Sequence, residues 1–329
     1  MRRAGLRYGF GRFATVLGLS LLQPLAHGQD YPSKPVTILV AYAPGGQGDM
    51  FARMVGEKLT AQLKQTFVVD NRPGVSGTVG TKLAVQAKKD GYTLFLGQTG
   101  EIVVNRVLMK DLGYDPLKDL IPVVMIGNAP LIMLAPTEAS YNNVSDFIQA
   151  ARAKPGEFTY ASVGAGTPGH LSAVALAVGA RLDLIHVPYK GVGPLMADLA
   201  GGRLQTFFSS ASAAMPQIKG GRFKALAVTT GQRMTSLPNV PTVAESGLAG
   251  FSHSLWGGLF APAGTPQSVI DRINTEVNAA LAGADIKTRL EGDNMAVPRN
   301  TPAEFAAFVN AEAEKFDRLA REANLRAAQ

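Results

Sequence analysis

Apolar and polar positions alternate along this chain with two periods, one typical of strands and one typical of helices. Short segments such as PVTILVAYA and YTLFLG are almost entirely apolar, whereas MFARMVGEKLTAQL places apolar residues three and four positions apart. TFVVDN and GTVGTKLAVQAK repeat the strand and helix patterns, so residues 35–97 predict strand, helix, strand, helix and strand in turn. This alternation is typical of a parallel, doubly wound α/β sheet.

The alternation starts again after a break near residue 121. The apolar stretch IPVVMIGNAPLIMLAP precedes the helix-like NVSDFIQAARA, the strand-like FTYASV, a glycine-rich loop and a helix from His170. LIHVPY, LQTFFSS and FKALAVTT predict further strands, and WGGLFAPAG predicts a strand before two or three C-terminal helices. About 300 residues exceed what one hydrophobic core usually organises, so two α/β units are expected.

The first 28 residues have the pattern of an export signal. Four arginines accompany an apolar run at residues 13–26, and Ala26-His27-Gly28 has small residues at the usual cleavage spacing. A membrane anchor is the alternative, but the run contains Gln23 and Pro24 and is shorter than the roughly 20 residues that span a bilayer. We therefore predict a periplasmic protein whose signal peptide, residues 1–28, is cleaved near Gly28.

Composition excludes several classes of function. The formal net charge is +7, and the four arginines of the signal supply four of these charges, which leaves +3 for the mature chain. A charge of this size gives no reason to expect a nucleic-acid partner. The chain has no cysteine, which excludes a disulfide framework, thiolate catalysis and cysteine zinc sites. We expect a monomer with no metal and no cofactor.

A glycine-rich loop follows the first predicted strand. AYAPGGQGDMFAR, residues 41–53, joins that strand to a helix through Gly45 and Gly46. Such a loop turns several backbone N–H groups toward one point, where the helix N-terminus adds partial positive charge, so it can hold a carboxylate or phosphate without Arg or Lys. The alternative is a tight turn in which Asp49 caps the helix.

A second loop, YASVGAGTPGHLS at residues 160–172, repeats this design in the second unit. Gly164, Gly166 and Gly169 match the dinucleotide pattern GxGxxG, but the acid expected about 20 residues later would be Asp183. Asp183 precedes a predicted strand instead of ending one, so a nucleotide site is not supported. One loop in each unit favours a ligand held between the units, at the carboxyl ends of the strands.

Segments along nearly the whole mature chain resemble one family. They include YPSKPVTILVAYAPGGQGDMFAR, VVDNRPGVSGTVG, KKDGYTLFLG, YASVGAGTPGHL, HVPYKGVGPLMADLAGG, KALAVTT, LPNVPTVAESGL and WGGLFAPAGTP. In this order they resemble the periplasmic solute-binding proteins of tripartite tricarboxylate transporters, the Bug-type family. The resemblance implies a two-lobed periplasmic-binding-protein (Venus flytrap) fold, each lobe a doubly wound, mostly parallel sheet flanked by helices. It also implies capture of a small organic carboxylate between the lobes and delivery to membrane permease subunits.

The family topology and the two long apolar stretches divide the chain into lobes. Residues 31–127 and 255–329 are expected in lobe 1, and residues 128–254 in lobe 2. In similar proteins, backbone and hydroxyl groups of two loops hold one ligand carboxylate, and these loops match Ala43 to Asp49 and Ser162 to His170 here.

Each candidate side chain has a structural alternative. Ser162 and Thr167 are expected to donate to the carboxylate, or else they are turn or N-cap residues. Asp49 lies by the ligand in the family pattern, or it favours the helix dipole. His170 either binds the ligand or is structural. The full predicted ligand-binding set is Ala43, Pro44, Gly45, Gly46, Asp49, Gln98, Thr99, Ser162, Gly164, Gly166, Thr167, His170 and Tyr189.

Three positions outside the two loops have similar alternatives. Gln98 and Thr99 follow a strand that opens toward the ligand, with an ordinary loop as the alternative. Tyr189 is expected to line the rim, Lys190 to face solvent, and Trp256, the one tryptophan, to pack in the core or at the hinge.

An enzyme is the rival class of function. Outside the predicted signal the histidines are His170, His186 and His253, and the sequence contains no GxSxG, no HExxH and no cysteine nucleophile. Hydrolysis is therefore poorly supported, and we predict no catalytic residues. A sensor role, in which the loaded protein presents its carboxylate to a signalling partner, stays open beside transport.

Overall fold

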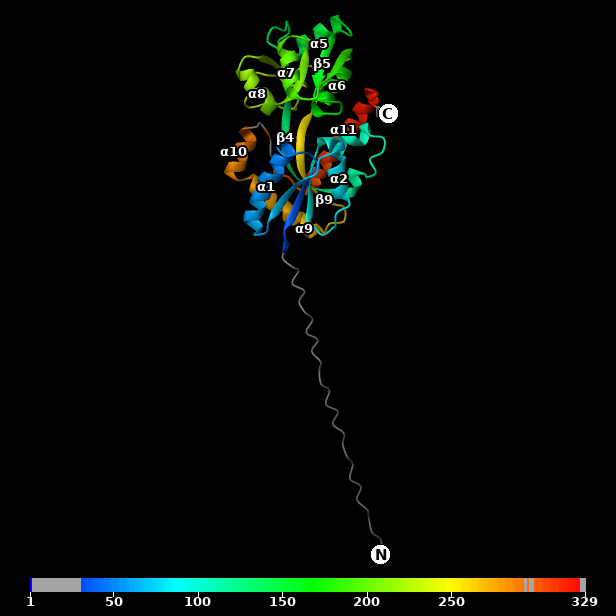
Figure 1. Ribbon diagram of the computed structural model, residues 1–329, viewed down its shortest axis with the longest axis vertical. Helices are drawn as coiled ribbons and strands as arrows, with labels where there is room; N and C mark the ends of the chain where they lie inside the picture. The colour runs from blue at the N-terminus through cyan, green and yellow to red at the C-terminus, as the bar shows by residue number, and fades with distance from the viewer. Residues whose placement is uncertain (2–30, 293–294, 296–298, 326–329) are drawn as a thin grey trace. The chain divides into compact units, whose positions relative to one another are not determined.

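The computed structural model describes residues 31–292, 295 and 299–325 together with Met1. Apart from Met1, the signal peptide predicted for residues 1–28 lies outside the described residues. All elements below belong to the unit that runs from Pro32 to Gln329. Figure 1 shows β4 passing between one group of elements with α5 to α8 and another with α1, α2 and α9 to α11.

The first part of the chain forms parallel strands covered by helices. Its elements are β1 (Val36–Val40), α1 (Gln47–Leu63), β2 (Phe67–Asn71), η1 (Val75–Gly77), α2 (Thr78–Val85) and β3 (Thr93–Gln98). β1 pairs in parallel with both β2 and β3. Phe51, Val55 and Leu59 are buried on one face of α1, so the four-residue spacing of apolar positions becomes the packed face of this helix. The predicted order of elements is confirmed here.

One long strand belongs to both halves of the sheet. After β3, the chain forms the π-helix η2 (Gly100–Val104), α3 (Asn105–Leu108), α4 (Pro116–Asp119) and β4 (Leu120–Pro136). β4 pairs with β9 (Ser254–Pro262) as far as Pro130, and from Leu131 onward it pairs with β7 and β8. Its apolar sequence is explained by this burial between neighbours on both sides.

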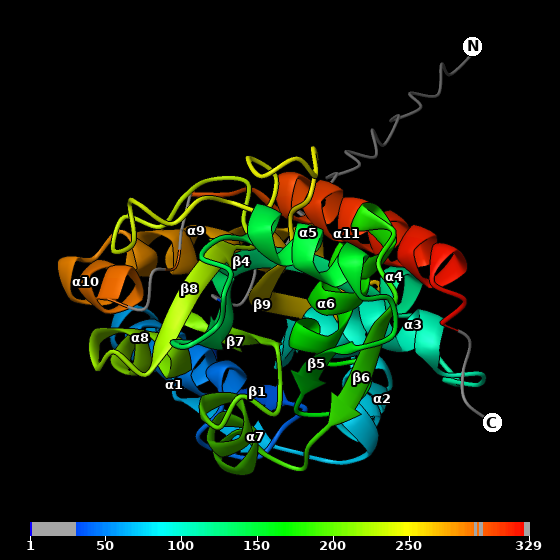
Figure 2. The ribbon, with the colours of Figure 1, turned by 90° about the horizontal axis from the view of Figure 1, so that it is seen from above.

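The second part of the chain repeats the α/β alternation. Its elements are α5 (Val144–Ala153), β5 (Phe158–Ser162), α6 (Pro168–Ala180), β6 (Leu184–Pro188), α7 (Val192–Ala200), β7 (Thr206–Ser210), α8 (Ala211–Lys219) and β8 (Phe223–Val228). β5 lies between β6 and β7 and is parallel to both, while β7 and β8 flank β4 in antiparallel pairs. Figure 2 shows these strands and helices from above.

The chain returns to the first half through β9, which pairs with β3 and β4. It ends in α9 (Gln267–Leu281), α10 (Ala284–Gly292) and α11 (Pro302–Glu322), and both α9 and α11 pack against β4. Trp256 of β9 is fully buried and meets Phe305 edge to face at 6.0 Å. The indole N–H of Trp256 donates to Glu312 Oε2 at 3.2 Å. Trp256 is thus a core residue on a strand that links the two halves.

The α/β, two-lobed fold is confirmed, and the sheet is mixed. We call β1, β2, β3 and β9 with their helices lobe 1, and β5 to β8 with α5 to α8 lobe 2. Parallel pairing joins β1 to β2 and β3, and β5 to β6 and β7, whereas every pairing of β4 and β9 is antiparallel. The prediction of mostly parallel sheets did not include these linking strands. The residue limits of the lobes, 31–127 with 255–329 and 128–254, stay a prediction.

Strand directions decide which ends of the two lobes meet. β3 is antiparallel to β9, which is antiparallel to β4, so β1 and β3 run in the same direction as β4, toward lobe 2. β7 is antiparallel to β4, so β5, β6 and β7 run toward lobe 1. The carboxyl ends of both sets therefore point toward each other, where open α/β sheets bind ligands.

Candidate functional site

The loop between β1 and α1 is closed from within by Asp49. Its Oδ2 accepts the Gly45 N–H at 3.0 Å, and its Oδ1 lies 2.9 Å from an Arg53 guanidinium nitrogen. The Arg53 hydrogen bond is the main reason that the pKa of Asp49 lies below its usual value. The carboxylate is buried and has protein partners, so the structure places Asp49 in the frame of the loop.

The glycines of this loop have different roles. Gly45 has a φ of 91°, a conformation that favours glycine, whereas Gly46, the N-cap residue before α1, has a φ of −82°. A methyl group at Gly46 would meet only the Ala43 carbonyl oxygen, at 3.9 Å, and residues 43–46 are exposed. At Gly48 a methyl group would come within 2.5 Å of Gln98 Oε1. Gly48 therefore permits close approach to β3, and Gly46 leaves the loop backbone open.

Gln98 and Thr99 differ in exposure and in role. The Gln98 side chain lies over Gly48, and its Nε2–H donates to Gln47 Oε1 at 3.5 Å. Thr99 is 1% exposed, and its hydroxyl accepts the Trp256 N–H at 3.3 Å. Thr99 thus joins the end of β3 to β9, and its hydroxyl is directed into the protein.

Glu101 is a buried acid beside this loop that our sequence analysis did not select. It is 0% exposed; its Oε2 accepts the Tyr42 hydroxyl at 2.8 Å and its Oε1 accepts the Gln98 N–H at 2.7 Å. Burial raises the pKa of Glu101 to about 7. The signal in the sequence is a single acid at the start of EIVV, before three apolar residues and two positions after the candidate residue Thr99.

The loop between β5 and α6 is held by its own hydroxyl groups. Ser162 is fully buried and its Oγ accepts the Gly164 N–H at 3.1 Å, while the Thr167 hydroxyl donates to the Gly164 carbonyl at 2.8 Å. Gly164 and Gly166 have φ of 134° and 78°, so the turn needs glycine at both positions. In this conformation the Ser162 and Thr167 hydroxyls both bond to Gly164 of the loop itself, as expected if they are turn residues.

Two histidines lie behind this loop. His170 Nδ1 accepts the Gly166 N–H at 3.2 Å, and His186 Nε2 lies 2.7 Å from Ser162 Oγ. The His170 and His186 rings are 4.3 Å apart, and Tyr160 stacks on His186 at 4.9 Å. Burial lowers the pKa of His170 to about 4 and also lowers that of His186. Both rings are neutral at pH 7 and position the loop without adding charge.

Tyr189 follows β6, next to Ser162. Its N–H donates to the Ser162 carbonyl at 2.8 Å, and its hydroxyl donates to Asp198 Oδ2 at 2.6 Å. Lys190 is exposed, as expected. The two lobes also meet near this loop, because a methyl group at Gly166 would lie 2.7 Å from Leu108 Cδ1 of α3.

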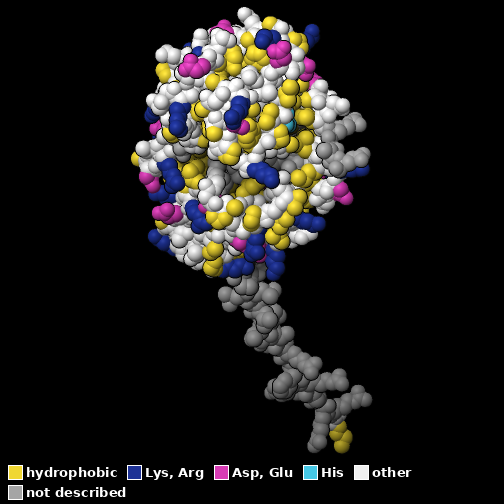
Figure 3. Space-filling model, turned by 45° about the horizontal axis from the view of Figure 1, so that its top comes forward, with side chains coloured by type: hydrophobic (Ala, Val, Ile, Leu, Met, Phe, Trp, Pro, Cys, Tyr) yellow, Lys and Arg dark blue, Asp and Glu magenta, His cyan; other side chains and the backbone are white. Residues whose placement is uncertain are grey.

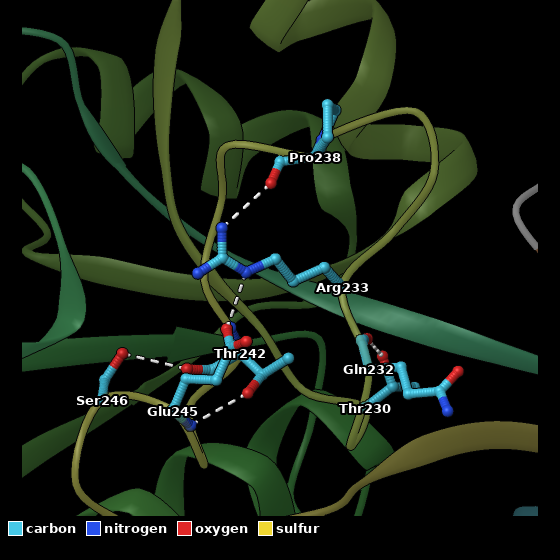
Figure 4. Close-up of polar contacts among 7 residues, drawn as sticks. All are labelled: Thr230, Gln232, Arg233, Pro238, Thr242, Glu245 and Ser246. Carbon is cyan, nitrogen blue, oxygen red and sulfur yellow. Dashed lines mark hydrogen bonds and ion pairs between the residues drawn. The ribbon is translucent and has the colours of Figure 1, made fainter.

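A separate cavity of about 1250 Å³ lies next to α9 and α10. Its wall includes residues 230–236, which follow β8, and this segment is held by Arg233. Figure 4 shows Arg233 donating to the Pro238 carbonyl and to Glu245, which also accepts the Thr242 N–H. The residues that line this cavity include none of the predicted ligand-binding set. We therefore separate this cavity from the candidate site.

Other kinds of site find no support in the described residues. Within residues 31–292, 295 and 299–325, no group of three or more His, Asp or Glu side chains is placed to hold a metal ion. In the same part of the chain, no helix has the length and hydropathy that a membrane crossing requires. On the face shown in Figure 3, Lys and Arg side chains are spread among acidic ones and do not form one basic patch.

Two lobes whose strand ends face each other, each with a glycine-rich loop at a helix N-terminus, define the class of solute-binding proteins. The family model described as "Tripartite tricarboxylate transporter family receptor" matches residues 51–325. The chain belongs to this family, whose members are periplasmic receptors. The family and the solved structures below are solute-binding proteins and not enzymes, as the sequence predicted.

Relatives cover nearly the full length of the chain. A protein from the tcbD-tcbE intergenic region of Pseudomonas sp. strain P51 is 37% identical over 91% of this chain and 89% of its own length. Protein BugT of Bordetella pertussis is 32% identical over 89% of this chain and 90% of its own. These similarities confirm the Bug-type resemblance.

Two solved structures of similar proteins contain ligands. Rpa4515 of R. palustris with adipate is 32% identical and has a TM-score of 0.77, with 90% of this chain and 99% of that chain covered. MatC of Rhodopseudomonas palustris with bound malate is 30% identical and has a TM-score of 0.74, with 88% and 99% covered. Adipate and malate are both dicarboxylates.

Proposed function

We propose that this chain is a periplasmic solute-binding protein that captures a small organic carboxylate between its lobes. The observation that carries the proposal is the pair of glycine-rich loops, residues 41–46 and 163–167, at strand ends that point toward each other. The adipate and malate bound to similar proteins support a dicarboxylate as the class of solute.

The anion is held by backbone N–H groups. α1 and α6 both begin without a side-chain capping hydrogen bond, so their first-turn N–H groups are not satisfied by a cap. Each helix N-terminus stabilises an anion by about 0.3–1 kcal/mol, and hydrogen bonds to a charged group contribute about 1.5–3 kcal/mol. Arg53 is ion-paired with Asp49 and His170 is neutral, so neither side chain offers a free positive charge to the carboxylate.

The candidate residues take two kinds of role in this proposal. Ala43, Pro44, Gly45, Gly46, Gly164 and Gly166 form the backbone surface that the carboxylate approaches, and Gln98 and Tyr189 border it. Asp49, Thr99, Ser162, Thr167 and His170 fix the loops in position. This assignment follows from exposure and from the partners of each side chain.

Delivery of the solute to the permease of a tripartite tricarboxylate transporter is the second part of the proposal. It is supported by the description of the family as a receptor of that transporter. Uptake of the identified acid by cells that lack this protein, with and without the gene restored, tests delivery. Normal uptake without the protein would favour the sensor role instead. Mass spectrometry of the periplasmic fraction tests export and cleavage near Gly28.

A thermal-shift screen tests solute binding. The panel contains adipate, malate, succinate, citrate, benzoate and glutamate. An acid at 100 times its Kd stabilises the folded state by about 2.7 kcal/mol, which gives a clear rise in Tm. We expect the largest rise with an aliphatic dicarboxylate. No rise with any acid of the panel would contradict the proposed function.

A further inference from the structure

Glu101 occupies an unusual position for a carboxyl group. It lies in the π-helix η2, directly after the carboxyl end of β3, and its side chain is fully buried. Short π-helices are rare and often occur at functional sites. A buried carboxylate without a cation is costly, so a role for this acid is expected.

The groups that face Glu101 are neutral. Tyr42 donates its hydroxyl to Oε2 at 2.8 Å, and Gln98 donates its backbone N–H to Oε1 at 2.7 Å. Tyr114 is the other titratable group that interacts with Glu101, and burial raises the pKa of both tyrosines, so both remain uncharged near pH 7. Among the described residues, no ion pair includes Glu101. Its charge is therefore not neutralised by a neighbouring cation.

Both hydrogen-bond donors connect Glu101 to the candidate site. Tyr42 directly precedes the exposed residues 43–46, and the Gln98 side chain lies over Gly48 in the first turn of α1. Glu101 is thus one residue and one hydrogen bond away from the loop that receives the solute. A negative charge on Glu101 weakens the binding of an anion at this loop, and protonation of Glu101 removes that repulsion.

We propose that Glu101 is a proton-binding site coupled to the solute site, so that capture of a carboxylate is accompanied by protonation of Glu101. The inference rests on the proposed function. The proton comes from solvent and forms an O–H bond on the Glu101 carboxyl group, while the solute keeps its charge and its bonds. Coupling is reciprocal: a proton on Glu101 strengthens solute binding by the same factor by which solute strengthens proton binding.

The pH range from 7 to 8 isolates this group. Burial raises the pKa of Glu101 to about 7, so about half of the free protein carries the proton at pH 7. Burial lowers the pKa of His170 to about 4 and of His253 to about 3, and it also lowers that of His186, so these rings are neutral in this range. Adipate and malate are almost fully ionised there. A fall in affinity with rising pH is then assigned to Glu101.

Calorimetric titration with adipate, and with malate as a second probe, tests the coupling. The titrations use two buffers of different ionisation enthalpy at pH 7, and the proteins are the wild type, Glu101→Gln and the control Glu312→Gln. Glu312 is also a buried acid, but it lies on α11 and pairs with Lys315. Gln keeps the shape of Glu101, and its amide can bond to both partners.

We expect the wild type and Glu312→Gln to take up as much as about half a proton per bound adipate at pH 7. Their affinity should fall from pH 7 to pH 8, by less than tenfold. Glu101→Gln should bind adipate with no proton uptake and no pH dependence. Equal proton uptake by Glu101→Gln and the wild type, or none by the wild type, would overturn the inference.

An NMR titration of the Glu101 carboxyl carbon in the solute-free protein gives an independent readout. We expect a midpoint near pH 7 that moves upward when adipate is added. A midpoint near the ordinary glutamate value would overturn the proton site even if adipate binds. If neither adipate nor malate binds at any pH, the proposed function fails for these solutes, and the coupling fails with it.

Discussion

Two neighbouring glycines in the first loop differ in why they are glycine. Gly45 has a positive φ, while Gly46 has a backbone conformation open to any residue and free space around its missing side chain. Glycine at position 46 is therefore not required by the fold. In our account it is required by the solute, which must approach the backbone at this point.

Gly46→Val should therefore weaken solute binding while leaving the protein folded. We expect at least a tenfold rise in Kd for the acid found in the thermal-shift screen, because the side chain blocks the loop backbone, with a change in unfolding free energy of less than about 1 kcal/mol. Calorimetry and urea unfolding measure the two quantities.

Two control variants sharpen this experiment. Gly231→Val places the same side chain at another open glycine, on the wall of the separate cavity, and should bind normally. Lys190→Ala removes an exposed cation close to Tyr189 and should also bind normally. Loss of solute binding in Lys190→Ala together with normal binding in Gly46→Val would contradict our account. It would show that a cationic side chain holds the carboxylate and that the loop backbone does not.

At the scale of elements, the sequence located both loops but not the groups that support them. Glycines between a strand pattern and a helix pattern indicate a turn, so the loops at residues 41–46 and 163–167 could be predicted from the sequence. The partners of Ser162 and Glu101 could not, because His186 is 24 residues from Ser162 and Tyr42 is 59 residues from Glu101. The direction of the Thr99 hydroxyl could not be predicted from the sequence either, and in the structure this hydroxyl is directed into the protein.

The loop between β5 and α6 should weaken in acid because of His170. Its pKa falls from 6.5 in the unfolded chain to about 4 in the folded protein, so the folded state binds this proton less tightly. The contribution of His170 to the unfolding free energy is full above pH 6.5, decreases as the pH falls below 6.5, and is lost once the pH has fallen through 4. The loss amounts to about 3 kcal/mol, and protonation also removes the acceptor of the Gly166 N–H.

His170→Asn tests this pH dependence, since the Asn amide oxygen offers an acceptor near the position of Nδ1 but does not titrate. Urea unfolding between pH 7 and pH 4 should show a smaller loss of unfolding free energy in the variant than in the wild type. Parallel pH profiles of the two proteins would show that His170 does not control this loss.

At the scale of the whole molecule, the sequence predicted the alternation of elements but not all of the pairing. Strand and helix periods are local properties, so most elements were placed correctly. The pairing of β4 with β9 on one side of the link and with β7 and β8 on the other depends on contacts between residues that are 73 to 142 positions apart. The antiparallel pairs of the linking strands were therefore absent from the prediction.

The two loops lie on different lobes, so one carboxylate should draw the lobes together. We expect small-angle scattering to give a smaller radius of gyration with the saturating acid than without it. Gly46→Val at the same acid concentration serves as the control and should stay at the radius of the free protein. An unchanged radius in the saturated wild type would indicate a fixed site.

The central claim is that backbone N–H groups of both loops hold the solute carboxylate, and a crystal structure with the bound acid tests it most directly. We predict a carboxylate within hydrogen-bond distance of N–H groups in residues 45–49 and in residues 163–170, with no Arg or Lys side chain in contact. An acid bound in the cavity beside α9 and α10, or held by a cationic side chain, would contradict the account.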